Sequence, residues 1–148
     1  MKQAVIDKRN LELILSDQKA EIESRKSERL CYRQEEQLVD LNSPQAQVVI
    51  GVRRCGKSTL CFQALQHMNE VFAYVDFDDE RLVGLQTNQL NDILEVLYKI
   101  YGDFHYIFFD EIQAHPTKSV AGLNQTPTIF TGLSFKFATF ATWNIKQT

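Results

Sequence analysis

The 148-residue sequence is poor in the features that mark membrane-embedded, secreted and strongly basic proteins. No apolar run approaches the roughly 20 residues that cross a bilayer, and Met1–Asp7 has no apolar core of the signal-peptide kind. The three cysteines, Cys31, Cys55 and Cys61, are odd in number and lack metal-ligand spacing, so we expect reduced thiols in a cytoplasmic protein without membrane contacts. The net charge of −3 gives no indication of nucleic-acid binding, while a local basic patch stays open.

Acidic residues and arginine are missing from the C-terminal part of the chain. Neither Asp nor Glu occurs after Glu111, and no Arg occurs after Arg81. Thr and Ser are abundant in residues 112–148, and the periodicity of a helix is lost there. Because this composition differs from that of the preceding residues, we treat 114–148 as a divergent tail, for which poor order is one expectation.

The N-terminal part has the opposite composition. Residues 1–40 are dense in charge of both signs and contain neither Pro nor Gly. We expect a helical segment of two helices, broken near Ser16-Asp17, that docks on a core domain formed by residues 41–113. A helix that binds a partner protein or nucleic acid is the alternative for this segment.

One stretch in the core carries a phosphate-binding motif between a predicted strand (45–50) and a predicted helix (58–66). It matches the P-loop pattern over its full length, Gly51-Val52-Arg53-Arg54-Cys55-Gly56-Lys57-Ser58. Gly51 and Gly56 permit the dihedrals of a tight turn whose N–H groups face a phosphate chain, and the helix aims its positive end at the same phosphates. We predict nucleotide binding here, with Lys57 at the β- and γ-phosphates and the Ser58 hydroxyl as a ligand of Mg²⁺.

The elements after this motif are a second strand at 71–77 and a helix at about 89–101, with Asn88 as its N-cap and Gly102 as its end. The strand runs into an acidic cluster that Arg81 follows, formed by Asp76, Asp78, Asp79 and Glu80. We interpret the cluster as a solvated loop near the nucleotide in which Arg81 pairs locally. A metal site is the alternative.

A second motif lies at the end of the predicted core domain. Tyr106-Ile107-Phe108-Phe109-Asp110-Glu111 describes a buried strand with two carboxylates at its C-terminal end, where open α/β sheets bind ligands. This is a Walker B pattern, in which Asp110 is predicted to hold Mg²⁺ through water and Glu111 to polarise the attacking water.

The order of these elements predicts an α/β fold of the P-loop NTPase class, a three-layer parallel sheet with right-handed crossovers. The additional Glu after the Walker B Asp resembles the branch in which a further strand lies between the P-loop strand and the Walker B strand. That strand comes next in sequence and carries a polar sensor residue. Thr128–Gly132 is a candidate for it, and Leu133–Phe137 is a candidate for a later segment.

Residues 51–59, 74–82 and 106–113 together resemble the predicted AAA-superfamily ATPases of bacteria and archaea. Members typically join an N-terminal ATPase domain to a C-terminal domain of unknown function, often described as nuclease-like. The resemblance implies ATP, Mg²⁺ and a site made of Gly51 through Thr59 with Asp110 and Glu111. It stops at Gln113, so we expect a truncated or frame-shifted member whose sheet is incomplete at the C-terminus.

Two functions follow from this sequence. The first is Mg²⁺-dependent ATP hydrolysis with Lys57 and Glu111 as catalytic residues. The second is a nucleotide-binding module, or an inert remnant, with little or no hydrolysis. Because no Arg follows Arg81, we expect any arginine that assists hydrolysis to come from a second copy of the chain or from a partner protein.

Overall fold

The computed structural model of the chain describes residues 5–40, 42, 47–52, 54–69, 71–111 and 136–142. Its helices and strands in chain order are α1 (Lys8–Ser24), β1 (Gln47–Gly51), α2 (Lys57–His67), β2 (Phe72–Asp76), α3 (Leu90–Tyr101), β3 (Tyr106–Asp110) and β4 (Lys136–Thr142). Short 3₁₀ turns connect them, namely η1 (Arg25–Ser27), η2 (Gln34–Leu38), η3 (Glu80–Leu82) and η4 (Thr87–Gln89). In this part of the chain no helix has both the length and the apolar character that a membrane span requires.

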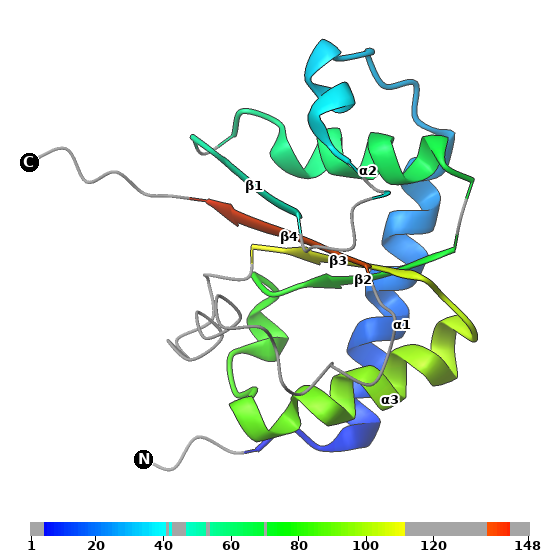
Figure 1. Cartoon of the computed structure of the whole chain (residues 1–148). Helices are drawn as coiled ribbons and strands as arrows, with labels where there is room; N and C mark the ends of the chain where they lie inside the picture. Colours follow the sequence, from blue (N-terminus) through cyan, green and yellow to red (C-terminus); the bar gives the residue numbers. More distant parts are fainter. Residues whose placement is uncertain are drawn as a thin grey trace, which may run out of the picture.

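The strands form one parallel sheet in the order β1-β4-β3-β2, with helices on both faces (Figure 1). In its register, Phe72 lies opposite Tyr106 and Asp76 lies opposite Asp110. Parallel strands place their carboxyl ends at the same edge of a sheet. The loop after β1 and the acids that end β2 and β3 therefore share one edge, as the sequence predicted.

Strand β4 corrects the expectation of an incomplete sheet. It pairs in parallel with β1 on one side and with β3 on the other, so the position next to the P-loop strand is filled. The candidate Thr128–Gly132 lies outside the described residues, and β4 instead begins at Lys136, near the end of the second candidate. The boundaries 1–40, 41–113 and 114–148 stay predictions.

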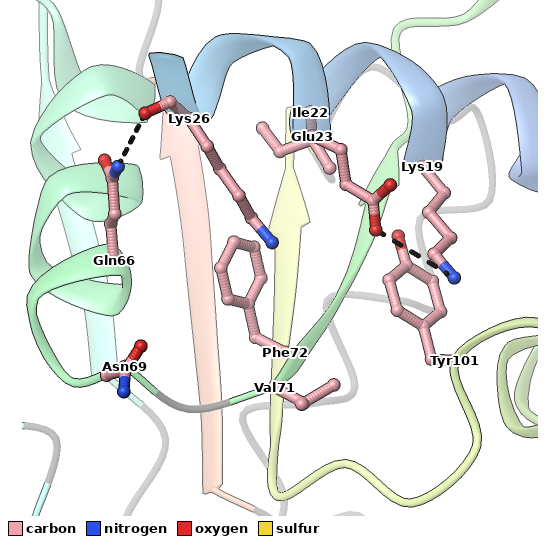
Figure 2. A pocket seen from close by; sticks show the side chains of 9 residues that line it. All are labelled: Lys19, Ile22, Glu23, Lys26, Gln66, Asn69, Val71, Phe72 and Tyr101. Carbon is pink, nitrogen blue, oxygen red and sulfur yellow. Dashed lines mark hydrogen bonds and ion pairs between the residues drawn. The ribbon is translucent and has the colours of Figure 1, made fainter. Parts of the chain in front are cut away.

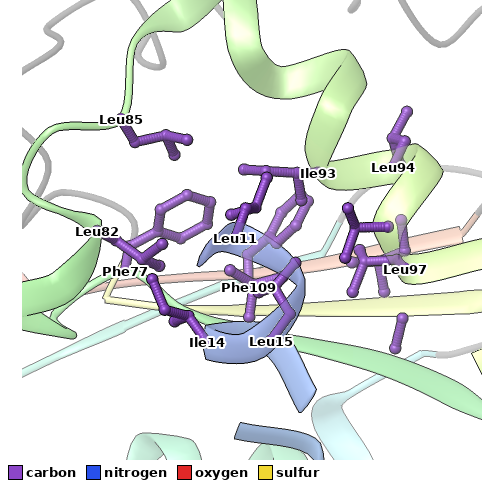
Figure 3. Close-up of a cluster of buried hydrophobic side chains, with 14 of the residues drawn as sticks. Leu11, Ile14, Leu15, Phe77, Leu82, Leu85, Ile93, Leu94, Leu97 and Phe109 are labelled. Carbon is purple, nitrogen blue, oxygen red and sulfur yellow. The ribbon is translucent and has the colours of Figure 1, made fainter. Parts of the chain in front are cut away.

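Alternate residues of β2 and β3 belong to two separate hydrophobic clusters, because successive side chains of a strand point to opposite faces. On the face covered by α3 and the first half of α1, the strands contribute Ala73, Val75, Ile107 and Phe109 (Figure 3). On the face covered by α2, they contribute Phe72, Tyr74, Tyr106 and Phe108. Burial on both faces explains why β2 and β3 are almost continuously apolar.

Helix α1 is continuous through Ser16 and Asp17, so the predicted break is wrong. Its buried residues recur at helical spacing, namely Leu11, Ile14, Leu15, Gln18 and Ile22, and the intervening polar residues face outward. Asp17 pairs with Arg81, 2.7 Å from its guanidinium. The apolar stripe therefore determines how far the helix extends, and the charged residues between its members do not interrupt it.

Helix α1 also packs along β2, the edge strand of the sheet. Its buried Gln18 side chain bonds to the backbone of that strand. The Gln18 amide accepts a hydrogen bond from the Asp76 N–H at 3.0 Å and donates one to the Asp76 carbonyl at 3.1 Å. It thereby provides the pairing that a neighbouring strand would otherwise give to β2.

The predicted ends of α3 were right at one end and wrong at the other. Gly102 ends the helix with a positive φ of 71°, as expected. Asn88 lies inside the preceding 3₁₀ turn, and the N-cap position belongs to Gln89. Gln89 is buried, and its amide donates to the Ile6 carbonyl at 2.7 Å, so a tertiary contact sets this end of the helix.

Candidate functional site

The loop between β1 and α2 turns through left-handed backbone. Gly56 is the N-cap of α2 with φ 85° and ψ 28°, and Arg54 has a φ of 64°. The Leu60 N–H donates to the Gly56 carbonyl at 3.0 Å and starts the helical ladder directly after the turn. Gly56 therefore occupies a position that disfavours any side chain. Arg53, a predicted member of the loop, lies outside the described residues.

Lys57 is buried at the start of α2, with only 8% of its surface exposed. Its ammonium donates to the Val52 carbonyl at 2.8 Å, which folds the side chain back over the loop. The ammonium also lies 4.0 Å from Cys55 Sγ, a long contact to a weak acceptor. An ammonium has three N–H donors, so at least one is left for an oxygen of a ligand. A buried cation inside a loop of backbone N–H groups is an arrangement that attracts anions.

Asp110 connects the end of β3 to this loop. The Ser58 hydroxyl donates to Asp110 Oδ1 at 2.8 Å, and the Tyr74 hydroxyl lies 3.5 Å from Oδ2. Burial raises the pKa of Asp110 above its ordinary value, and the Ser58 hydrogen bond opposes that rise. The fold thus brings together residues that stand 52 positions apart in sequence.

Glu111 follows Asp110 in a left-handed conformation, with φ 48°. Its N–H donates to Asp110 Oδ1 at 3.1 Å, so the two acids are tied to each other by a backbone contact. A non-glycine residue with positive φ just after a buried strand is unusual and turns the chain sharply. The turn leaves Glu111 partly exposed beside the loop.

Asp76 is a neighbour of this site that the motifs alone did not assign to it. It ends β2 opposite Asp110, and burial raises its pKa to about 6. The sequence signal that could have assigned Asp76 to the site is its place at the end of a strand, because Asp76 and Asp110 end neighbouring parallel strands.

The rest of the acidic cluster behaves as the sequence predicted. The Arg81 guanidinium bonds the Asp79 carboxylate at 2.8 Å and holds the pKa of Asp79 down to about 2. In the described part of the chain, no group of three or more His, Cys, Asp or Glu side chains is arranged to hold a metal ion. The described geometry therefore favours the local ion pair over the alternative of a metal site in the cluster.

Two arginines of the N-terminal segment also reach this region, and no sequence pattern pointed to either of them. Arg25 Nη2 lies 3.5 Å from the Thr59 hydroxyl, and Arg33 Nη1 donates to the Cys55 carbonyl at 2.8 Å. Both come from the connection after α1, which lacks the periodicity on which a sequence-based placement depends.

A pocket of about 600 Å³ lies at the opposite ends of the strands (Figure 2). Its wall includes Phe72 at the start of β2 and Tyr101 at the end of α3. Lys26 extends over the Phe72 ring at 5.9 Å, and Lys19 lies 4.8 Å from the centre of the Tyr101 ring. None of the predicted site residues lines this pocket, so the pocket is separate from the edge of the sheet that carries the loop between β1 and α2.

Comparison with known proteins places the core motifs in a family. A family model described as the AAA domain matches residues 43–123, more than half of the chain. An uncharacterized protein of Methanocaldococcus jannaschii is 40% identical over 68 residues, which are 45% of this chain and 15% of that relative. The match therefore covers a small part of the relative's length. No solved structure matches the chain.

Proposed function

The chain belongs to the AAA domain family, and from this premise we propose that it binds ATP with Mg²⁺ at the loop between β1 and α2 and hydrolyses it. Its family is one of P-loop NTPases, which the α/β architecture with a parallel sheet fits. We also propose that the sheet is the central layer of the three-layer P-loop fold, with β4 as the strand between the P-loop strand and the Walker B strand.

One observation carries the proposal more than any other. Ser58 Oγ lies 2.8 Å from Asp110 Oδ1, so the two motifs that the sequence places far apart meet at one point. A P-loop hydroxyl beside a carboxylate at a strand end is the pair that P-loop NTPases use for a metal ion. An accidental Gly-rich turn would have no reason to meet the end of β3.

The residues present fit Mg²⁺, which takes oxygen ligands and binds through one or two carboxylates together with phosphates. The Ser58 hydroxyl and the buried Asp110 carboxylate are the oxygen donors that would hold the ion. When bound, the ion supplies positive charge that stabilises the β- and γ-phosphates during transfer. A nearby cation also favours the charged form of Asp110, which burial alone disfavours.

The other residues have roles that follow from their positions. The Lys57 ammonium, held by the Val52 carbonyl, presents its remaining donor capacity to phosphate oxygens. The N–H groups at the start of α2 add hydrogen bonds without the cost of moving a side chain. Glu111, fixed beside Asp110 by its backbone, orients the attacking water and accepts its proton.

Nucleotide binding with little hydrolysis is the second candidate. The chain has no Arg after Arg81, and an arginine that stabilises the transition state contributes roughly 10³- to 10⁵-fold to the rate in P-loop enzymes. Such an arginine would come from a second copy of the chain or from a partner protein. In its absence the chain would bind ATP and turn it over slowly.

Binding of a fluorescent ATP analogue and release of phosphate test both candidates on the full chain. Lys57→Ala removes the buried cation and should weaken binding at least about 100-fold, since hydrogen bonds to charged groups are strong. Glu111→Gln should keep binding and lose turnover. Lys99→Ala is the matched control, because Lys99 is exposed and pairs with Glu12 on α1.

The outcomes separate the candidates. Turnover that Glu111→Gln abolishes supports hydrolysis, whereas binding without turnover in the unaltered chain supports the second candidate. If the folded chain binds no nucleotide, or if Lys57→Ala binds as well as the unaltered chain, both candidates are wrong.

A further inference from the structure

The connection between α1 and β1 returns along α2 and carries an arginine to the loop. Three side chains of α2 contact this connection. The Gln66 amide donates to the Lys26 carbonyl at 3.0 Å, and the Gln63 amide donates to the Cys31 carbonyl at 2.8 Å. The His67 ring contacts the Glu36 carboxylate. Gln63 is buried, and Leu30 and Val39 pack against the cluster beneath α2. The backbone is therefore anchored on both sides of Arg33.

Arg33 contacts the loop at two neighbouring residues, Cys55 and Gly56. Its Nη1 donates to the Cys55 carbonyl at 2.8 Å. A Cβ added to Gly56 would lie 2.6 Å from Nη2 and 2.8 Å from Nη1. The positive φ of Gly56 is what favours glycine here, and a side chain at this position would also displace the guanidinium of Arg33.

The contact fixes the direction of one peptide unit. No described peptide bond is cis, so the Cys55 carbonyl and the Gly56 N–H point in opposite directions across their shared plane. Because Arg33 binds the carbonyl, the Gly56 N–H points away from the Arg33 guanidinium. A P-loop depends on inward N–H groups, because they are its donors to phosphate.

We propose that Arg33 is a positioning residue that holds the Cys55–Gly56 peptide in the orientation required for phosphate binding. The inference rests on the proposed function, since it concerns the same loop. Arg33 acts through the backbone, and in this it differs from an arginine that touches the transferred phosphate. It is also supplied by the same chain, whereas an arginine assisting hydrolysis was expected from another subunit.

Three variants test this role in the full chain with a fluorescent ATP analogue. Arg33→Ala should weaken ATP binding about five- to tenfold, the usual effect of losing a hydrogen bond from a charged donor. Arg33→Lys keeps the charge but loses the planar fork, so it should recover only part of that loss. Arg29→Ala is the control, because Arg29 is an exposed arginine of the same connection, and it should bind as the unaltered chain does.

Two further measurements separate positioning from other effects. The midpoint of urea unfolding should be unchanged in Arg33→Ala, since Arg33 is exposed, and amide exchange in the loop should become faster. A loss of affinity that follows a loss of stability in both Arg33 variants would assign a structural role and overturn the proposal.

The control for the premise is the unaltered chain. If it binds ATP and Arg33→Ala binds equally well, the inference is wrong and the proposed function stands. If the unaltered chain binds no ATP, both are wrong.

Discussion

The two ends of the parallel strands differ in what they bury. At the carboxyl ends the protein buries charged groups, the Lys57 ammonium and the Asp110 carboxylate, beside the partly buried Asp76. At the amino ends it has a pocket whose lysines extend over aromatic rings. Burial of a charged group costs free energy unless a partner offsets it, and the Val52 carbonyl and the Ser58 hydroxyl are the partners of these two groups.

This difference separates the part of the molecule that provides hydrophobic stabilisation from the edge of the sheet that carries the candidate site. The cluster of α1, α3 and the sheet contains mostly aliphatic and aromatic side chains and provides hydrophobic stabilisation (Figure 3). The loop edge contains polar residues whose pKa values are raised by burial. Carboxylates at a strand end whose pKa is raised by burial are candidates for a functional site.

The largest expected effect is a loss of core packing away from the loop. Leu15 is fully buried between α1 and the sheet, so Leu15→Ala should destabilise the fold by about 3 kcal/mol in urea unfolding. Leu13→Ala is the matched control, because Leu13 is 62% exposed on the same helix and should change stability by less than about 0.5 kcal/mol. Equal effects of the two substitutions would mean that α1 does not pack as described.

A smaller effect is expected where α1 closes the sheet edge. Gln18→Ala leaves the Asp76 N–H and carbonyl without their partner and should cost about 2 kcal/mol in urea unfolding. Asn10→Ala is the control, because Asn10 is exposed on the same helix. If Gln18→Ala is as stable as Asn10→Ala, the edge does not depend on this amide.

Removing a charge at the loop edge should stabilise the protein. Burial raises the pKa of Asp76 from 3.8 to about 6, so the folded chain holds a proton between those pH values that the unfolded chain releases. Stability is therefore lost as pH rises from about 4 to about 6, and Asp76→Asn avoids that loss.

Because Asp76 is partly exposed, solvent screening limits the gain of Asp76→Asn to roughly 1 kcal/mol at pH 8. The gain should disappear below pH 4, where both states of the unaltered chain are protonated. Urea unfolding at pH 4, 6 and 8 without Mg²⁺ checks this. A variant that is less stable than the unaltered chain at pH 8 would show that Asp76 is held by a favourable partner.

The smallest expected effect lies at the amino ends of the strands. Lys26→Ala changes the pocket but not the loop, so it should leave affinity for an ATP analogue within about twofold of the unaltered chain. A much larger loss would show that the two ends of the strands are coupled. Lys57→Ala in the same assay provides the contrast.

Much of the loop edge was predictable because its signals are local. Gly56 and Lys57 belong to a contiguous motif, and Asp110 follows an uninterrupted apolar strand, so each position was assigned without knowledge of the fold. Gly102 was predicted to end α3 for the same reason. The order of strands and helices then predicted a parallel sheet, which the structure has.

The failures concern residues whose positions depend on distant partners. The break expected near Ser16-Asp17 was wrong because the apolar face of α1 packs continuously, whatever its polar face contains. The N-cap of α3 lies at Gln89 because Gln89 bonds to Ile6. The resemblance implied a strand between the P-loop strand and the Walker B strand, but the residues of β4 were not identified, because its pairing with β1 and β3 is long-range.

The sequence by itself determined that a phosphate-binding loop and an Asp-Glu strand end are present, because both are short patterns whose chemistry lies in consecutive residues. Only the tertiary structure decided that the Ser58 hydroxyl bonds directly to Asp110, that Lys136–Thr142 form β4, and that Arg33 reaches the Cys55 carbonyl. These contacts join residues far apart in the chain. They depend on strand order and helix packing, which no local pattern encodes.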